Sequence, residues 1–149
     1  MSFLPLEVAE RFVGIYRQAA EEAGRTPTAD DVLYRHFAHV AESDEAARRE
    51  MGEAMAEMTQ AAAASAGAAS DMSGSAVLDP DDTSFQPFFF GGPETVLAKA
   101  RALSDIGVGV LDMAFIVPGA ARQGRSAALF GELVLPQVAA LGTEEPALA

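Results

Sequence analysis

The hydrophobic and polar positions of this chain follow two periods, and together they predict helices that alternate with strands. Over residues 5–24 the side chains of Val8, Phe12 and Ile15 recur at helical spacing, and charged residues lie mostly outside that stripe. This pattern predicts an amphipathic helix whose apolar stripe faces the core. Residues 32–41 are rich in β-branched, aromatic and aliphatic side chains, which is typical of a strand.

A second helix and a long irregular segment follow the first predicted strand. Ser43 and the two acidic residues after it suit an N-cap and a first turn, which predicts a helix over residues 44–64. Residues 65–90 are rich in Gly, Ser and Asp-Pro, and a loop of this length is usually functional or disordered. The aromatic residues that end this loop either anchor it in the core or form a lid over an apolar substrate. They are Phe85, Phe88, Phe89 and Phe90.

The Gly-Gly-Pro-Glu turn at residues 91–94 begins the next predicted helix. Pro93 suits the first helical position, where its missing N–H costs nothing, and the glutamate after it matches the helix dipole. Apolar periodicity predicts that this helix covers residues 93–106. Residues 108–117 carry one charge, on Asp112, and are typical of a buried strand. Two strands that alternate with helices predict a parallel sheet.

The last third of the chain predicts a loop, one interrupted helix and a tail. Pro118 and Gly119 open a loop that continues through Gly124. The apolar positions that follow predict a helix over residues 126–141, which Pro136 should kink or split. Residues 143–149 are expected to be a disordered tail.

Composition excludes several classes of function. The net charge is −12, with 22 acidic residues against 10 basic ones, which disfavours binding to nucleic acid or to an anionic membrane surface. No Cys is present, so disulfides and thiolate sites are excluded, and two His without clustered carboxylates give no metal site. No apolar stretch approaches the roughly 20 residues that span a bilayer. We therefore expect a soluble, cytoplasmic protein.

Three blocks of sequence carry a resemblance to a known family. Residues 34–46 resemble the strand, acidic turn and helix start found in the C-terminal part of bacterial-luciferase-like flavin-dependent monooxygenases. Residues 91–96 are similar to that family's Gly-Ser/Thr-Pro-Glu-x-Val turn, with Gly92 at the Ser/Thr position. Residues 129–136 resemble its closing helix. The order and spacing of the blocks match across nearly the whole chain.

The resemblance implies a partial α/β barrel. The family folds as an eight-stranded parallel (β/α)8 TIM barrel, which typically takes about 250 residues. The two predicted strands would be its last two, and residues 65–90 would be a variable insertion near the active-site mouth. Residues 1–149 are therefore expected to form the C-terminal portion of a luciferase-like barrel domain, present as a fragment without the preceding strands.

The resemblance also implies cofactors and partners for a complete enzyme. Reduced FMN and dioxygen would oxidise a small organic substrate, with a flavin reductase as a further partner and a deazaflavin as the alternative cofactor. The chain alone is expected to bind no flavin tightly and to be inactive. A homo-oligomer or a complementing chain is a further expectation. The alternative class of function is a non-catalytic interaction module that pairs its sheet edges with another chain.

Two groups of residues are candidates for the flavin site, and no catalytic residue is assigned. Arg35 and His39 share the face of the first strand that would point into a barrel, with His39 near the active-site end. They either meet an anionic group of the flavin or substrate, or have structural roles. Gly91 and Gly92 precede a helix N-terminus, which suits a phosphate, but Pro93 removes one donor and the following glutamate repels anions. A structural turn is the alternative.

Overall fold

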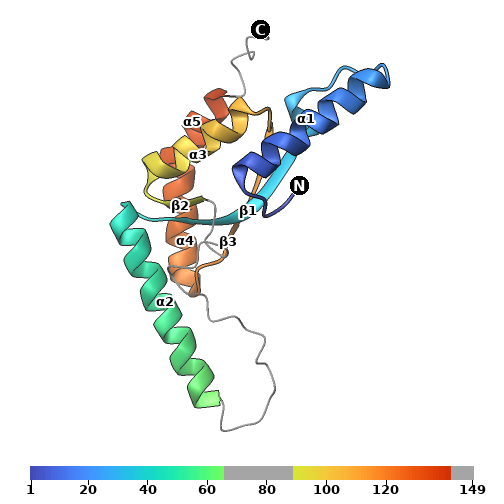
Figure 1. Cartoon of the computed structure of the whole chain (residues 1–149). Coiled ribbons are helices and arrows are strands. Elements are labelled where there is room, and N and C mark those ends of the chain that lie inside the picture. The colour runs from blue at the N-terminus through green and yellow to red at the C-terminus, as the bar shows by residue number, and fades with distance from the viewer. Residues whose placement is uncertain (66–88, 142–149) are drawn as a thin grey trace.

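The protein is an α/β structure built on a three-stranded parallel sheet, seen here in a computed structural model that describes residues 1–65 and 89–141 (Figure 1). The strands are β1 (Leu33–Val40), β2 (Phe89–Gly91) and β3 (Val110–Phe115). The helical segments are α1 (Leu6–Glu22), the 3-10 turn η1 (Ala29–Asp31), α2 (Asp44–Ser65), α3 (Pro93–Asp105), α4 (Ala120–Leu129), the π-helical segment η2 (Phe130–Val134) and α5 (Leu135–Leu141). No helix within the two described ranges is long and apolar enough to cross a membrane.

The predicted parallel sheet is confirmed, but the count of two strands is corrected to three. The additional strand, β2, pairs in parallel with the end of β1 and is only three residues long. A segment this short shows no period that a sequence pattern could reveal. Residues 66–88 of the predicted insertion loop and the predicted tail at 143–149 lie outside the described residues.

The strand order is β2-β1-β3, so β1 is the central strand. One edge of β1 pairs with β2 and the other edge pairs with β3. In the pairing with β3, Leu33 lies opposite Val110 and Ala38 opposite Phe115. In a barrel of consecutive β/α units, β2 would instead lie between the other two strands. The chain therefore keeps the parallel strands and covering helices of a barrel, with a different neighbour on the second edge of β1.

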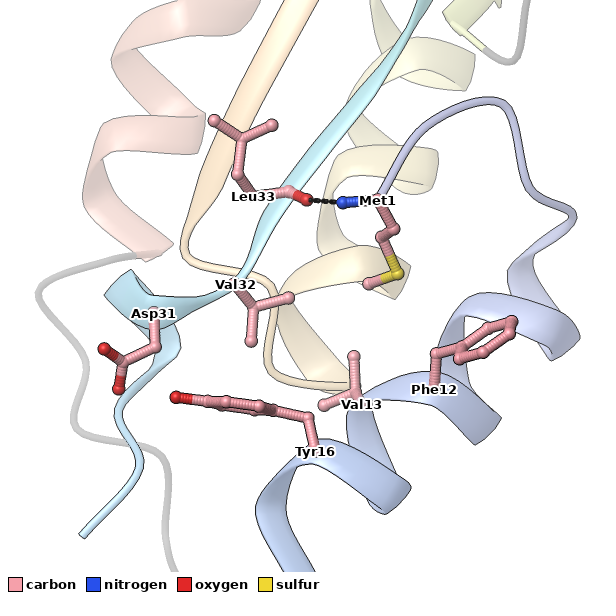
Figure 2. Close-up of a pocket in the computed structure, with 7 residues that line it drawn as sticks. All are labelled: Met1, Phe12, Val13, Tyr16, Asp31, Val32 and Leu33. Carbon is pink, nitrogen blue, oxygen red and sulfur yellow. Dashed lines mark hydrogen bonds between the residues drawn. The ribbon is translucent and has the colours of Figure 1, made fainter. Parts of the chain in front are cut away.

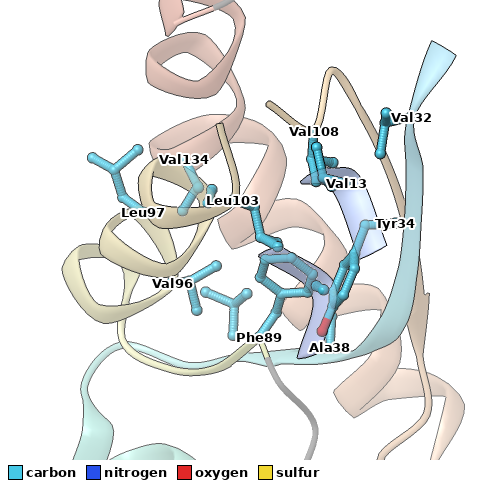
Figure 3. Close-up of a cluster of buried hydrophobic side chains, with 13 residues drawn as sticks. Val13, Val32, Tyr34, Ala38, Phe89, Val96, Leu97, Leu103, Val108 and Val134 are labelled. Carbon is cyan, nitrogen blue, oxygen red and sulfur yellow. The ribbon is translucent and has the colours of Figure 1, made fainter. Parts of the chain in front are cut away.

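One face of the sheet carries the core. Tyr34, Ala38 and Val40 alternate along β1 and are buried, so this face packs on helices. Phe89 of β2 extends the layer, and Figure 3 shows its ring beside that of Tyr34. Helix α3 covers this layer with the apolar residues that its periodicity predicts. They are Val96, Leu97, Ala100 and Leu103.

The predicted burial of the α1 stripe is wrong. Val8 is 37% exposed, Phe12 52% and Ile15 53%, whereas Ala9 and Val13 of the same helix are buried. The helix turns its smaller side chains toward the sheet, since a small residue lets the backbone approach the core closely. The periodicity correctly shows that α1 has an apolar side, but the stripe of larger side chains is not covered.

The last helix differs from its prediction at its start but is interrupted where expected. It begins at Ala120 instead of residue 126, because the turn is completed by Gly119 alone, whose φ is +105°. The predicted loop at 118–124 is therefore mostly helix. The expected interruption near Pro136 is present, since the π-helical segment Phe130–Val134 separates α4 from α5. Proline lacks the N–H that would continue the regular helix.

Candidate functional site

The carboxyl edge of the sheet gathers the candidate residues. At this edge β1 ends at Val40 and β2 at Gly91, and these two residues are opposite each other in the parallel register. Helix α2 begins beside the end of β1, and α3 begins directly after β2. Barrel enzymes place their sites at this end of their strands. His39 lies here, as alternation along the first strand predicts, and Gly91 and Gly92 lie here in the turn that begins α3.

His39 is almost completely buried, with 1% of its surface exposed. Its Nε2 lies 3.2 Å from Oε2 of Glu50 in α2, without the alignment of a hydrogen bond, and its ring lies beside that of Phe90. Burial lowers the pKa of His39, and nearby Arg122 and Arg125 lower it further, while Glu50 opposes the shift. The imidazole is therefore held in its neutral form at neutral pH.

The buried histidine makes a prediction for the pH dependence of stability. Because the folded state lowers the pKa of His39 below its ordinary value of about 6.5, the unfolded chain binds more protons just below that pH. The free energy of unfolding should therefore fall as pH drops from about 7 toward 5, by at most about 1.4 kcal/mol per pH unit for this group. Urea unfolding at several pH values measures it.

A histidine variant isolates this effect. His39→Gln should flatten the part of the pH profile between about pH 7 and 5 that belongs to this residue. The half-buried His36, whose pKa burial also lowers, should supply the remainder, and His36→Gln measures that share. A slope that is unchanged by His39→Gln would contradict the assignment.

Ser126 joins α4 to the end of β1. Its side chain is 1% exposed, and its Oγ accepts a hydrogen bond of 2.7 Å from the backbone N–H of Val40. The serine thereby satisfies a buried N–H near the end of the central strand, where no strand partner does so. No local sequence pattern indicates this role, because a single Ser within a helix is usually exposed.

An ion-pair cluster connects α4 to α2 beside this edge. The Arg122 guanidinium donates to both carboxylate oxygens of Glu57, at 2.6 and 2.9 Å, and lies 3.8 Å from Glu53. It also donates to the carbonyl oxygen of Pro118 at 3.0 Å. The hydrogen bonds from Arg122 lower the pKa of Glu57. The charge of Arg122 is thus paired with the carboxylates of Glu57 and Glu53 in the same chain.

The Gly-Gly-Pro-Glu turn already holds an anionic group, the carboxylate of Asp44. The Gly92 N–H donates to Oδ1 of Asp44 at 2.7 Å, and the Thr95 hydroxyl donates to Oδ2 at 2.9 Å. The hydrogen bond from Gly92, followed by that from Thr95, lowers the pKa of Asp44. Asp44 is the first residue of α2, so it ties the N-terminal ends of α2 and α3 together. The sequence pattern predicts Asp44 as an acidic residue in the first turn of this helix, but it does not reveal the contact with Gly92.

Arg35 lies away from the other candidates. Its Nε is 2.8 Å from Oδ2 of Asp112 in β3, and both side chains are substantially exposed. The two residues are directly opposite each other on neighbouring strands. This pair explains why a charge interrupts the otherwise apolar third strand. His39 is four residues further along β1, so the structure does not bring Arg35 and His39 into one cluster.

The candidate cations and the Gly92 amide at this site are engaged by carboxylates of the same chain. Arg35 and Arg122 each pair with carboxylates, and the Gly92 amide is engaged by Asp44. Within residues 1–65 and 89–141, no group of three or more His, Cys, Asp or Glu is arranged to hold a metal ion. The arrangement can position a wall of a larger site, and it contains a neutral buried imidazole at the strand end.

Comparison with known proteins identifies a family and two solved structures that this chain resembles. A family model described as luciferase-like monooxygenase matches residues 1–109. The structure of monooxygenase RslO1 from Streptomyces bottropensis matches 92% of this chain and 40% of its own, at 24% identity and a TM-score of 0.61. No curated protein matches this chain.

A second solved structure also matches. It is the oxygenating constituent of 3,6-diketocamphane monooxygenase, a type II Baeyer–Villiger monooxygenase from the CAM plasmid of Pseudomonas putida, in complex with FMN. The match covers 91% of this chain and 41% of that one, at 23% identity and a TM-score of 0.56. The present chain thus spans about two fifths of the length of the solved structures that it resembles.

Proposed function

The chain belongs to the luciferase-like monooxygenase family, and from this premise we propose that it is the C-terminal portion of a flavin-dependent monooxygenase. The single observation that supports this most is the family match over residues 1–109, which includes β1, β2 and α3. In the complete enzyme, reduced flavin would supply the oxidising chemistry with dioxygen, and a small organic substrate would be oxidised. A separate reductase would supply the reduced flavin.

The residues of this chain would contribute structure to that enzyme more than contacts to its cofactor. A flavin phosphate needs free N–H donors or cations, but the Gly92 amide and Arg122 are engaged by carboxylates of the same chain. His39 is buried beside Glu50, and Arg35 is paired with Asp112. These four residues therefore offer no free donor or cation to the phosphate, and we assign no catalytic step to them.

The role that fits these contacts is that of a rigid barrel wall. Asp44 fixes the start of α3 against α2, and Ser126 fixes α4 against the end of β1. Such contacts hold the carboxyl edge of the sheet in place, where the reaction of a barrel enzyme occurs. The flavin would be held mainly by strands that this chain does not contain.

Titration of the purified chain with FMN tests whether this chain holds the flavin by itself. We expect no stoichiometric quenching of flavin fluorescence, because the Gly92 amide, Arg122 and Arg35 are already engaged by carboxylates of the same chain, and we expect the same result with a deazaflavin. Tight FMN binding by the chain alone would contradict the proposal. Tight binding of the deazaflavin only would instead indicate a deazaflavin-dependent oxidoreductase.

The coding sequence upstream of Met1 tests the proposed larger enzyme. The proposal expects a continuation, in frame or shifted by a frame change, that encodes the earlier β/α units of a luciferase-like barrel. The polypeptide extended by that continuation should bind FMN with one-to-one stoichiometry. An upstream sequence unrelated to the family would count against the proposal.

A further inference from the structure

The face of the sheet that lies opposite the core carries a defined set of side chains. Residues that alternate along a strand share one face, and paired residues of neighbouring strands lie side by side on it. The register of β1 with β3 therefore places three pairs on this face. They are Leu33 with Val110, Arg35 with Asp112, and Phe37 with Ala114. Figure 2 shows the side chain of Leu33 pointing away from those of Val32 and Val13, which belong to the core.

This face is open to solvent along both strands. Leu33 is 43% exposed and Val110 is 37% exposed, and the other four side chains of the set are partly or largely exposed. The opposite face of β1, by contrast, buries Tyr34 and Ala38 completely. Parallel sheets are normally covered on both faces, so the open face calls for a partner.

The three pairs differ in character along the strands. In the middle pair, Nε of Arg35 lies 2.8 Å from Oδ2 of Asp112, and the two side chains are 54% and 39% exposed. The two outer pairs are apolar, and in each of them the residue of β1 is larger than its neighbour in β3. The exposed ring of Phe3 packs on that of Phe37, 4.6 Å between centroids, and adds apolar area at that end.

A second copy of this face complements the first. If the copy is rotated by 180° about an axis that runs along the strands between β1 and β3, each residue of the β1 set faces its own β3 neighbour in the other copy. Arg35 of each copy then faces Asp112 of the other, so the four charges alternate in sign around a square. In the same orientation Phe37 faces Ala114, and large side chains face smaller ones, as interdigitation of two packed sheets requires.

Two occupants would suit this face, and its own pattern favours the second copy. The preceding strands of a barrel would lie across it in a longer polypeptide, because this is the face that points into a barrel. A match to those strands depends on residues outside this chain. The match of the face to itself follows from the register of β1 with β3 at all three levels.

The geometry points to a homodimer in which two copies of this chain pack the open faces of β1 and β3 together, with Arg35 of each copy paired to Asp112 of the other. Six side chains a copy form the patch, against roughly 20–30 residues a side in a standard interface. The dimer is therefore weak, with a dissociation constant of roughly 10–100 µM. It goes beyond the proposed function, which the FMN titration and the upstream sequence test independently of self-association.

Analytical ultracentrifugation measures the dimer. At about 0.15 M salt, where the net charge of −12 on each copy is largely screened, sedimentation from below to above this concentration range should show a reversible monomer–dimer equilibrium. Leu33→Asp should raise the dissociation constant at least about tenfold, because it places a charge in an apolar contact. Met58→Asp, at a position of α2 that is 44% exposed, is the matched control and should leave the constant unchanged. A chain that stays monomeric throughout, or a dimer that Leu33→Asp leaves intact, would overturn the proposal.

Two charge reversals test the pairing itself. Arg35→Asp gives the face two acidic side chains, and Asp112→Arg gives it two basic ones. Each variant alone should dimerise at least about tenfold more weakly, because like charges then face each other. An equimolar mixture of the two should form a heterodimer, since an acidic face then meets a basic one.

The variant that carries both reversals is the control for folding. It restores the ion pair within the chain as well as the pairing between copies, so it should dimerise as the original chain does. Homodimers of either single variant that are as tight as those of the original chain would overturn the proposal. So would a mixture that does not associate although both variants keep the circular dichroism spectrum of the original chain. If a single variant does not fold, a monomeric double variant would overturn the proposal instead.

Discussion

Replacing Phe89 with alanine should cost about 3–5 kcal/mol of unfolding free energy, the largest loss we expect from any single core substitution. Phe89 is completely buried, and its ring packs edge-on against Tyr34, 6.4 Å between centroids (Figure 3). It is also the first residue of β2, opposite Ala38 in the register. Its removal would leave a cavity between β2, β1 and α3. Urea unfolding followed by circular dichroism measures the loss.

The neighbouring aromatic residue is the matched control. Phe90 is only partly buried and packs at the edge of a small cluster that includes Ala41, so Phe90→Ala should cost roughly 1–2 kcal/mol. If Phe89→Ala does not fold at all, Phe89→Leu keeps most of the packing and should give a measurable intermediate stability. Equal losses at the two positions would show that Phe89 is not the anchor of this strand.

Some features of this fold could be predicted from the sequence pattern, and the strand of Phe89 could not. Helix ranges followed from periodicity and end signals, so the predicted 44–64 and 93–106 differ by one residue from Asp44–Ser65 and Pro93–Asp105. The anchor interpretation of the aromatic cluster is confirmed for Phe89, which is in the core. The strand to which Phe89 belongs was missed because three residues carry no readable alternation.

Features that depend on distant pairing were beyond the local pattern. The stripe of α1 that includes Phe12 shows which side of the helix is apolar, but what covers that side is decided by tertiary contacts. Likewise, the pairing of β3 with β1 joins residues far apart in the chain, and consecutive strands are neighbours only as a tendency. Local periodicity contains neither piece of information.

Some residues of the candidate site could be predicted from local sequence, and others could not. Alternation placed His39 near the end of the first strand, turn chemistry placed Gly91 and Gly92 before a helix N-terminus, and all three lie where predicted. The residues that hold the site together were missed, since Asp44 is 48 positions from Gly92 and Ser126 is 86 positions from Val40. An Asp at a helix start and a Ser within a helix have common local explanations, so neither residue signals its distant contact.

The contact between Asp44 and the glycine turn leads to the second large expected effect. Gly91→Ala should cost about 2–4 kcal/mol, because two penalties coincide at this position. Its φ is +139°, a conformation that L-residues rarely adopt, and an added Cβ would lie 2.5 Å from Oδ1 of Asp44 and 3.0 Å from Cγ2 of Thr95. The methyl group would therefore strain the backbone and displace the carboxylate that caps α3. Thermal or urea unfolding measures the loss.

A double-mutant cycle separates the two penalties. Asp44→Ala alone should cost about 0.5–2 kcal/mol through loss of the cap. In the double variant the methyl group no longer meets a carboxylate, so the combined cost should be less than the sum of the single costs. Gly14→Ala is the control for glycine replacement, because nothing lies within 4 Å of its added Cβ on α1. It should stabilise the protein by about 0.5–1 kcal/mol. Additive costs in the cycle would mean that Asp44 and Gly91 do not form one unit, and that the turn is held by backbone conformation alone.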